Sequence, residues 1–146
     1  MYILDSDHLS VLQFQDGDEF KRLSGRISAH QNTDFFVTII SFHEQVNGWS
    51  SYINKSQDSS AVVRAYQKFE LLISNFSAAQ VLPFSSDAAE VFNELRGQQI
   101  RVGTMDLRIA SIAIANQMTL LTRNTVDFSR IPGLAIQDWL SISIGE

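Results

Sequence analysis

Four acidic residues in separate parts of the chain have the side chains that a divalent-metal site requires. They are Asp5, Glu44, Asp106 and Asp127. Carboxylates that gather at one partly buried place repel one another, which raises their pKa values unless a cation offsets the charge. The chain has no cysteine, so a hard ion with oxygen ligands, Mg²⁺ or Mn²⁺, is favoured over Zn²⁺. We therefore expect a carboxylate site for Mg²⁺ or Mn²⁺.

Each acid also has a purely structural interpretation. Asp5 or Asp7 is typical of a helix N-cap, where a short side chain accepts from orphan amides. Ser41 and Glu44 have the spacing of a capping box, and an acid such as Asp106 is favoured in a first helical turn. In the structural interpretation, Asp127 is an ordinary loop residue. Taken singly, the acids leave both interpretations open, and only their joint placement favours a site.

That placement depends on alternating strands and helices. The apolar and β-branched runs predict strands at 2–4, 35–40, 80–84, 118–122 and 134–136. Helical spacing predicts helices after residue 5 and at 18–29, 41–52, 62–76, 85–98 and 104–117, the last of them buried. This alternation predicts an α/β fold with a parallel sheet and helices on both faces. Ligands of such sheets bind beyond the carboxyl ends of the strands, which is the edge that the four acids would share.

Length and composition describe a globular protein. With 146 residues, 45% of them hydrophobic, the chain has the size of a single domain spanning 1–146. Its net charge of −5 argues against a protein that coats nucleic acid by bulk charge. No apolar run approaches the roughly 20 residues of a membrane span, and the N-terminus lacks the basic segment of a signal peptide. We expect a soluble protein of the cytoplasm.

The basic residues are unevenly distributed. Residues 96–130 contain five arginines and only two acidic residues. A basic strip on an acidic body is compatible with an anionic ligand held at one site, and equally with ordinary scatter of surface charge. The three histidines have no metal-binding spacing, and His30 and His43 are expected at the surface. The sequence has no dinucleotide, P-loop or nucleophile-elbow motif, which excludes those classes of enzyme.

Four segments stand in a distinctive order and spacing: 4–7 (LDSD), 41–44 (SFHE), 103–110 (GTMDLRIA) and 121–134 (LTRNTVDFSRIPGL). Together they resemble the PIN-domain ribonucleases, and in particular the VapC-like toxins of bacterial toxin–antitoxin pairs. The resemblance covers nearly the whole chain. It implies a three-layer α/β/α sandwich with a small parallel sheet and a divalent-metal-dependent endoribonuclease. It also assigns the catalytic acids to Asp5, Glu44, Asp106 and Asp127, with Asp5 and Asp106 as direct metal ligands.

The resemblance further implies an RNA substrate, of which tRNA is one candidate, a small cognate antitoxin and a homodimer. Two positions differ from the common pattern of the family. Asp7 stands where asparagine is frequent, so it either joins the metal site or caps a helix. Asn124 stands where some members carry the fourth acid, so the fourth position belongs either to Asp127 or to Asn124.

The mechanism that follows is phosphodiester hydrolysis assisted by one or two Mg²⁺ ions. One carboxylate would accept the proton of the attacking water, and Glu44 and Asp127 would hold a second ion or water molecules around the first. Further residues expected to orient this shell or to contact substrate are Arg108, Thr122, Arg123 and Asn124.

Two other functions remain as alternatives. Asp5-Ser6-Asp7 is also the D-x-D of a haloacid-dehalogenase-like phosphatase, but that chemistry needs a later lysine and the chain has none after Lys68. The second alternative is a catalytically inactive PIN-like scaffold that binds a protein partner. A titration with Mg²⁺ or Mn²⁺ distinguishes the two functions, because the absence of saturable binding favours the scaffold.

Overall fold

A five-stranded parallel sheet forms the centre of the structure, a computed structural model that describes residues 1–142. In sheet order the strands are β3 (Val81–Leu82), β2 (Phe35–Thr38), β1 (Tyr2–Leu4), β4 (Thr119–Leu121) and β5 (Ile136–Gln137). The chain first adds β2 and β3 on one side of β1 and then returns to add β4 and β5 on its other side. The strand order therefore reverses between β1 and β4. Such a reversal opens a crevice at the carboxyl ends of the strands, where ligands of α/β sheets bind.

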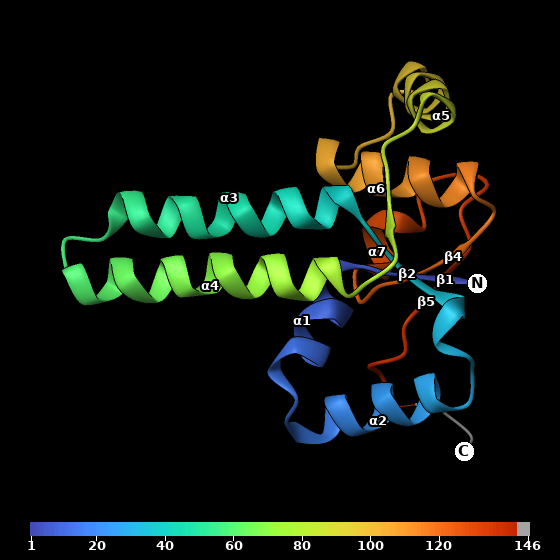
Figure 1. The fold of residues 1–146 in the computed structure, drawn as a ribbon. Helices are drawn as coiled ribbons and strands as arrows, with labels where there is room; N and C mark the ends of the chain where they lie inside the picture. Colours follow the sequence, from blue (N-terminus) through green and yellow to red (C-terminus); the bar gives the residue numbers. More distant parts are fainter. Residues whose placement is uncertain (143–146) are drawn as a thin grey trace.

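Helices cover both faces of this sheet. They are α1 (Ser6–Phe14), α2 (Gly17–Ser28), α3 (Ile39–Lys55), α4 (Ser59–Ser77), α5 (Ser86–Gly97), α6 (Thr104–Ala115) and α7 (Thr125–Phe128). In Figure 1, α5 and α6 lie on one side of the strands and α1 and α2 on the other, while α3 and α4 form a long hairpin that projects beyond the sheet. None of these helices combines the length and the apolar character that a membrane span requires.

Two apolar clusters, one on each face, fix the three layers. Ile3 and Leu120 from the central strands pack with α6, whose Ile109 and Ile112 are fully buried. The next residues of the same strands, Leu4 and Leu121, belong to the second cluster, because successive side chains of a strand point to opposite faces. The predicted α/β/α sandwich is confirmed, and so is the prediction that the helix opening at residue 104 is buried.

The boundary between β2 and α3 differs from the prediction. The sequence predicts a strand to Ile40 and a helix from Ser41, but β2 ends at Thr38 and α3 begins at Ile39. The Thr38 hydroxyl accepts a hydrogen bond from the Ser41 amide at 3.2 Å and thereby caps the helix. Ser41 is consequently not an N-cap, and the predicted capping box of Ser41 and Glu44 is wrong. The side chain of Glu44 remains available for another role.

The other element boundaries differ by smaller amounts. The strands predicted at 80–84 and 134–136 are only two residues long, at Val81–Leu82 and Ile136–Gln137. The segment around residue 127, expected to be a loop, contains the single helical turn α7. The predicted domain continues to residue 146, and its last four residues lie outside the described part.

Candidate active site

Asp5 lies at the point where the strand order reverses. It follows β1 directly and is the N-cap of α1, where its Oδ1 accepts from the Ser6 amide at 2.8 Å. Its own amide donates to the carbonyl of Leu121 at the end of β4, at 2.9 Å. Its Oδ2 accepts from the Thr122 hydroxyl at 2.8 Å. Both central strands thus hold Asp5, whose side chain is nearly buried although it is an acid.

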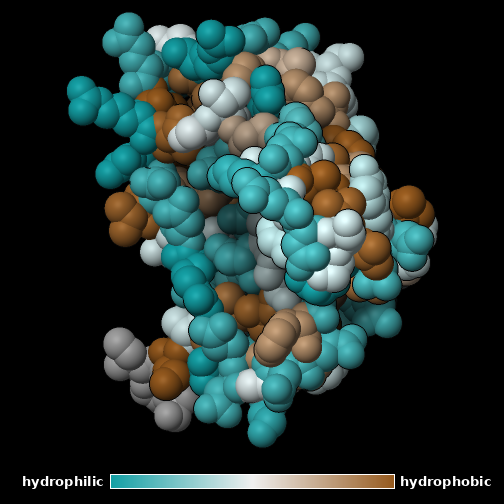
Figure 2. Space-filling model, turned by 90° about the vertical axis from the view of Figure 1, so that its left-hand side faces the viewer, coloured by the Kyte–Doolittle hydropathy of each residue, from teal (hydrophilic) through white to brown (hydrophobic). Residues whose placement is uncertain are grey.

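The other predicted acids lie around Asp5. Glu44 is in the second turn of α3, where its Oε1 accepts from the Ser6 hydroxyl at 3.3 Å, and Asp106 is in the first turn of α6. The charges of Asp5 and Asp106 act on Glu44, and the charge of Asp127 on α7 acts on Asp106. Figure 2 views the side toward which the strands run and shows a hydrophilic hollow there, beside the α3–α4 hairpin. The structure therefore brings all four acids to one edge of the sheet.

Burial and mutual repulsion disfavour the ionised forms of these acids. Burial first, and then the charge of Asp7, raise the pKa of Asp5 to about 6, against the opposing hydrogen bonds from Thr122 and Ser6. Burial and the charges of Asp5 and Asp106 raise the pKa of Glu44 to about 7. Burial, Asp127 and Asp7 raise the pKa of Asp106. Three carboxyls that resist ionisation at one place form a site that a cation would stabilise.

Asp7 behaves differently from its neighbours. Burial acts to raise the pKa of Asp7, but hydrogen bonds from the His8 ring and from the Arg123 amide outweigh it and lower the pKa. Its Oδ1 lies 2.6 Å from His8 Nδ1, and its Oδ2 accepts from the Arg123 amide at 2.9 Å. Both oxygens of Asp7 are thus engaged by the protein. This arrangement holds the ends of β1 and β4 together.

The sequence gives no sign of the role of His8, which is fully buried. Its Nε2 accepts a hydrogen bond from the Trp139 amide at 3.1 Å. Because Nε2 accepts, Nδ1 carries a proton and donates it to Asp7 Oδ1. The partner amide is 131 positions away in the chain, so no local pattern marks this contact. His30 and His43 are exposed, as predicted.

Replacing His8 with alanine is expected to lower the free energy of unfolding by about 3 kcal/mol, because it leaves a cavity and a buried Trp139 amide without its acceptor. Urea denaturation measures this change. His43→Ala, an exposed histidine on α3, is the matched control and is expected to stay within about 0.5 kcal/mol of the parent. Equal stability of the two variants would show that the buried histidine network contributes nothing.

The residues predicted to orient the shell or contact substrate have distinct positions. Thr122 is fully buried and acts through Asp5. Asn124 donates from Nδ2 to Asp127 Oδ2 at 3.1 Å, so it supports the fourth acid. The Arg123 guanidinium forms an ion pair with Glu19. Arg108, in contrast, is half-buried on α6 with no carboxylate partner among residues 1–142.

The donor set suits Mg²⁺ or Mn²⁺. Within residues 1–142, no three Asp, Glu or His side chains are arranged as a ready set of metal ligands. Mg²⁺ commonly keeps several waters and uses only one or two carboxylates of the protein. Asp5 and Asp106, which interact electrostatically with each other, offer such a pair. Carboxylate oxygens are the donors that such hard cations prefer.

Comparison with known proteins gives concordant matches. Residues 2–134 match the PIN domain. Ribonuclease VapC2 of Rickettsia felis is 30% identical over 113 residues, which cover 75% of this chain and 77% of that protein. The tRNA(fMet)-specific endonuclease VapC of Salmonella typhimurium is 34% identical over 67 residues, 43% of this chain and 51% of that protein. A chain in the crystal structure of VapBC2 from Rickettsia felis bound to a promoter DNA fragment superposes with a TM-score of 0.69 at 25% identity, covering 94% of this chain and 98% of that one.

Proposed function

The chain belongs to the PIN domain family, and we propose that it is an endoribonuclease that hydrolyses RNA phosphodiester bonds as the toxin of a toxin–antitoxin pair. One observation carries this proposal. Four acids, one directly after β1 and the others on α3, α6 and α7, lie at the carboxyl ends of the strands, and three of them have raised pKa values. The likeness to Ribonuclease VapC2 of Rickettsia felis supports the same activity.

Asp5 and Asp106 are the residues that we propose as direct ligands of Mg²⁺ or Mn²⁺. When bound, such an ion would neutralise charge on the reacting phosphate and lower the pKa of water. The hydrogen bonds from Ser6 and Thr122 fix the carboxylate plane of Asp5. Such hydrogen bonds orient the ligands of metal sites and are part of their affinity.

Glu44 is the carboxylate that we propose as the proton acceptor. Its pKa of about 7 suits proton transfer near neutral pH. The Ser6 hydroxyl engages Oε1, so Oε2 takes the proton of the attacking water. The position of Ser6 next to Asp5 holds the base and the proposed metal ligand in a fixed relation.

For the fourth acid we propose Asp127 rather than Asn124. Asn124 donates to Asp127 Oδ2, and Arg130 lies 3.4 Å from Asp127 Oδ1. The charge of Asp127 nevertheless acts on Asp106, which supports Asp127 as the fourth carboxylate. For Asp7 we propose a structural role, because His8, Thr122 and Arg123 already engage its oxygens.

We propose a small cognate antitoxin as the protein partner. The similar VapBC2 structure from Rickettsia felis is that of a toxin–antitoxin complex, which supports this partner. Helix α4 exposes apolar side chains that a protein partner or a second copy would cover, namely Val63, Tyr66, Leu71 and Ile73. We also propose that the protein forms a homodimer and acts in the cytoplasm, and that residues 1–146 form a single domain. Because the Salmonella typhimurium relative is a tRNA(fMet)-specific endonuclease, tRNA is the first substrate to test.

Sequencing of RNA 5′ ends after induction of the chain tests the function. The parent is expected to produce new 5′ ends at a few positions, and Asp106→Asn is expected to produce none, because it removes a proposed metal ligand but keeps the size of the side chain. Purified parent protein should reproduce the same cuts with Mg²⁺ or Mn²⁺ and lose them with a chelator.

A parent that produces no new ends, and that shows no saturable Mn²⁺ binding by calorimetry, would overturn the nuclease. That pair of results would favour the PIN-like scaffold. Cleavage by Asp106→Asn at the parental rate would retain the nuclease and overturn only the assignment of Asp106.

A further inference from the structure

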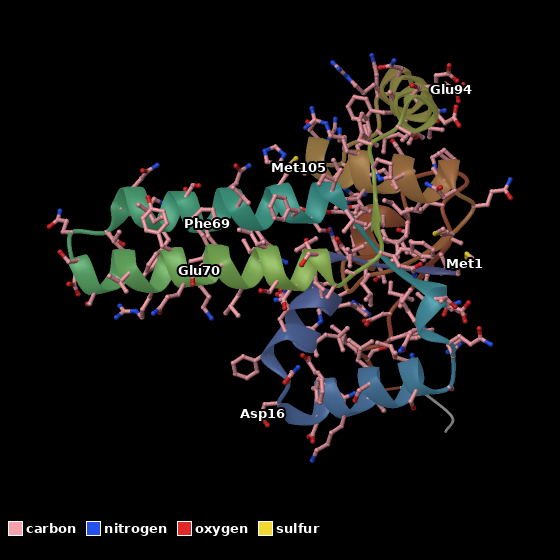
Figure 3. All side chains as sticks on the ribbon, viewed as in Figure 1. Met1, Asp16, Phe69, Glu70, Glu94 and Met105 are labelled. Carbon is pink, nitrogen blue, oxygen red and sulfur yellow. The ribbon has the colours of Figure 1, made fainter. Side chains whose placement is uncertain are left out.

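A second hollow lies between the end of α5 and the start of α6. It has a volume of about 340 Å³. Ile100 and Val102 contribute apolar surface, and the polar lining comes from Arg96, Thr104 and Arg108. In Figure 3, nitrogen-tipped side chains project from α5 and from the start of α6 on this side, whereas Glu94 projects from the opposite side of α5. The hollow is therefore basic, unlike the carboxylate site.

Two guanidinium groups meet over one aromatic ring in this hollow. Arg96 from α5 and Arg108 from α6 lie 5.6 and 5.7 Å from the centroid of the Phe92 ring. Neither forms an ion pair with an acid of residues 1–142, in contrast to Arg123 and Arg130. Two cations held at one ring without an anion repel each other, and a bound anion would relieve that repulsion. The planar fork of arginine matches the oxygens of a phosphate group.

The hollow and the carboxylate site share the N-terminal end of α6. Asp106 and Arg108 are two positions apart, which places them roughly 200° apart around the helix axis. Thr104, the first residue of α6, is exposed and lines the hollow. An extended strand that crosses this end of the helix can thus reach both sites. It cannot place the same phosphate in both, because the helix lies between them.

We infer that this hollow binds a backbone phosphate of the RNA strand that lies some nucleotides away from the phosphate that is cleaved. This inference rests on the proposed nuclease function and names a part of its substrate site. A chain with net charge −5 and four acids at its centre repels a polyanion. Arg96 and Arg108, which have no carboxylate partner within residues 1–142, supply a local attraction for the strand.

Binding of a short labelled single-stranded RNA of mixed sequence tests the inference without cleavage. The measurement uses fluorescence anisotropy with the full-length Asp5→Asn chain, alone and combined with Arg96→Gln, Arg108→Gln or both. Each single change is expected to weaken binding about threefold, and the double change about tenfold. The slope of log affinity against log salt should become shallower by about 0.7 for each arginine removed. Arg108→Lys, which keeps the charge but not the fork, should lie between parent and Arg108→Gln.

Arg64→Gln on α4 is the matched control, because it removes an exposed arginine on the projecting hairpin. Its affinity and salt slope should equal those of the parent. If Arg96→Gln and Arg108→Gln behave like Arg64→Gln, the two arginines only cover the Phe92 ring and the inference is wrong.

Cleavage by the parent distinguishes this failure from failure of the function. In the otherwise unchanged chain, the arginine variants should raise KM for the RNA that the parent cuts and leave kcat within about twofold. A parent that cleaves while its arginine variants keep the parental KM overturns the inference alone. A parent that never cleaves overturns the function, and the binding measurement then still decides whether the hollow holds RNA.

Discussion

Asp5→Asn is expected to abolish metal-dependent RNA cleavage and, at the same time, to make the metal-free protein more stable. The rate should fall on the order of 10³-fold or more, because the change removes a proposed metal ligand. Stability should rise because the parent must hold an almost buried carboxylate beside other acids. Few substitutions of a buried polar residue are stabilising, so the combination of both effects identifies a functional acid.

The sign of the stability change follows from the raised pKa of Asp5. A carboxyl with a pKa of about 6 in the folded protein and 3.8 as its model value binds its proton more tightly when folded. The stability that this proton contributes is present below about pH 4 and is lost as the pH rises through 6. At pH 8 the ionised Asp5 therefore destabilises the fold, and asparagine does not. We expect a gain on the order of 2 kcal/mol, or about 5 °C in Tm.

Asparagine can satisfy the local hydrogen bonds. Its Oδ1 can accept from the Ser6 amide, as Asp5 does, and asparagine is as good an N-cap as aspartate. Its Nδ2 can donate to the Thr122 hydroxyl oxygen, and that hydroxyl can then donate to Asp7 Oδ2, 3.3 Å away. The fold is therefore expected to survive the change.

Calorimetry at pH 8 in the presence of a chelator measures the stability, and cleavage of the RNA cut by the parent measures the activity. Glu70→Gln is the control of equal charge change. Glu70 is exposed on α4 in the projecting hairpin (Figure 3), so the Glu70→Gln variant should match the parent in both measurements. An Asp5→Asn protein that is less stable than the parent would contradict the interpretation of Asp5 as a strained, functional carboxylate.

The sequence predicts which acids form this site, but it does not predict the hydrogen bonds that hold them in place. Asp5, Asp106 and Asp127 are recognisable because each lies just after a strand or in a first helical turn, and Glu44 lies one turn into the helix that follows a strand. Parallel strands bring such positions to one edge. That relation needs only the order of elements, which apolar periodicity reveals. It does not need exact boundaries, so the error at Ile39 and Ile40 leaves Glu44 at the same edge.

The contacts that hold the acids depend on positions distant in the chain. His8 pairs with the Trp139 amide, and Thr122 with Asp5, and neither pair has a local pattern. The start of α3 differs from the prediction for another reason. Ile39 and Ile40 extend a β-branched run that is typical of a strand, but the Thr38 hydroxyl caps a helix at that point. A single side-chain hydrogen bond thus starts the helix at Ile39, where residue propensity alone favours a continued strand.

Lowering the pH from about 8 to about 5 is expected to reduce kcat/KM for RNA cleavage on the order of 10³-fold. Asp5, with a pKa of about 6, is then about one-tenth ionised, which weakens Mn²⁺ binding about tenfold because a protonated carboxyl is a poor ligand. Glu44, with a pKa of about 7, is about one-hundredth ionised and seldom free to accept a proton. The two losses multiply, and the slope of log kcat/KM approaches two per pH unit.

Three measurements separate the contributions of these two acids. Calorimetric titration with Mn²⁺ should show the tenfold loss of affinity and proton release on binding at pH 6. Glu44→Gln should retain most of that pH-dependent affinity, while its residual cleavage loses about one unit of slope. Glu70→Gln should keep the parental profile.

The stability of the metal-free protein should change in the opposite direction over the same range. The raised pKa values of Asp5 and Glu44 mean that protonation relieves burial and repulsion, so unfolding becomes harder as the pH falls from 8 to 5. As the pH falls from 8 to 5, RNA cleavage is therefore expected to decrease while the stability of the metal-free protein increases. If both fall together with pH, acid unfolding explains the loss of activity, and the carboxylates do not titrate as the structure requires. Opposite slopes would tie the loss of cleavage to the protonation of these two acids.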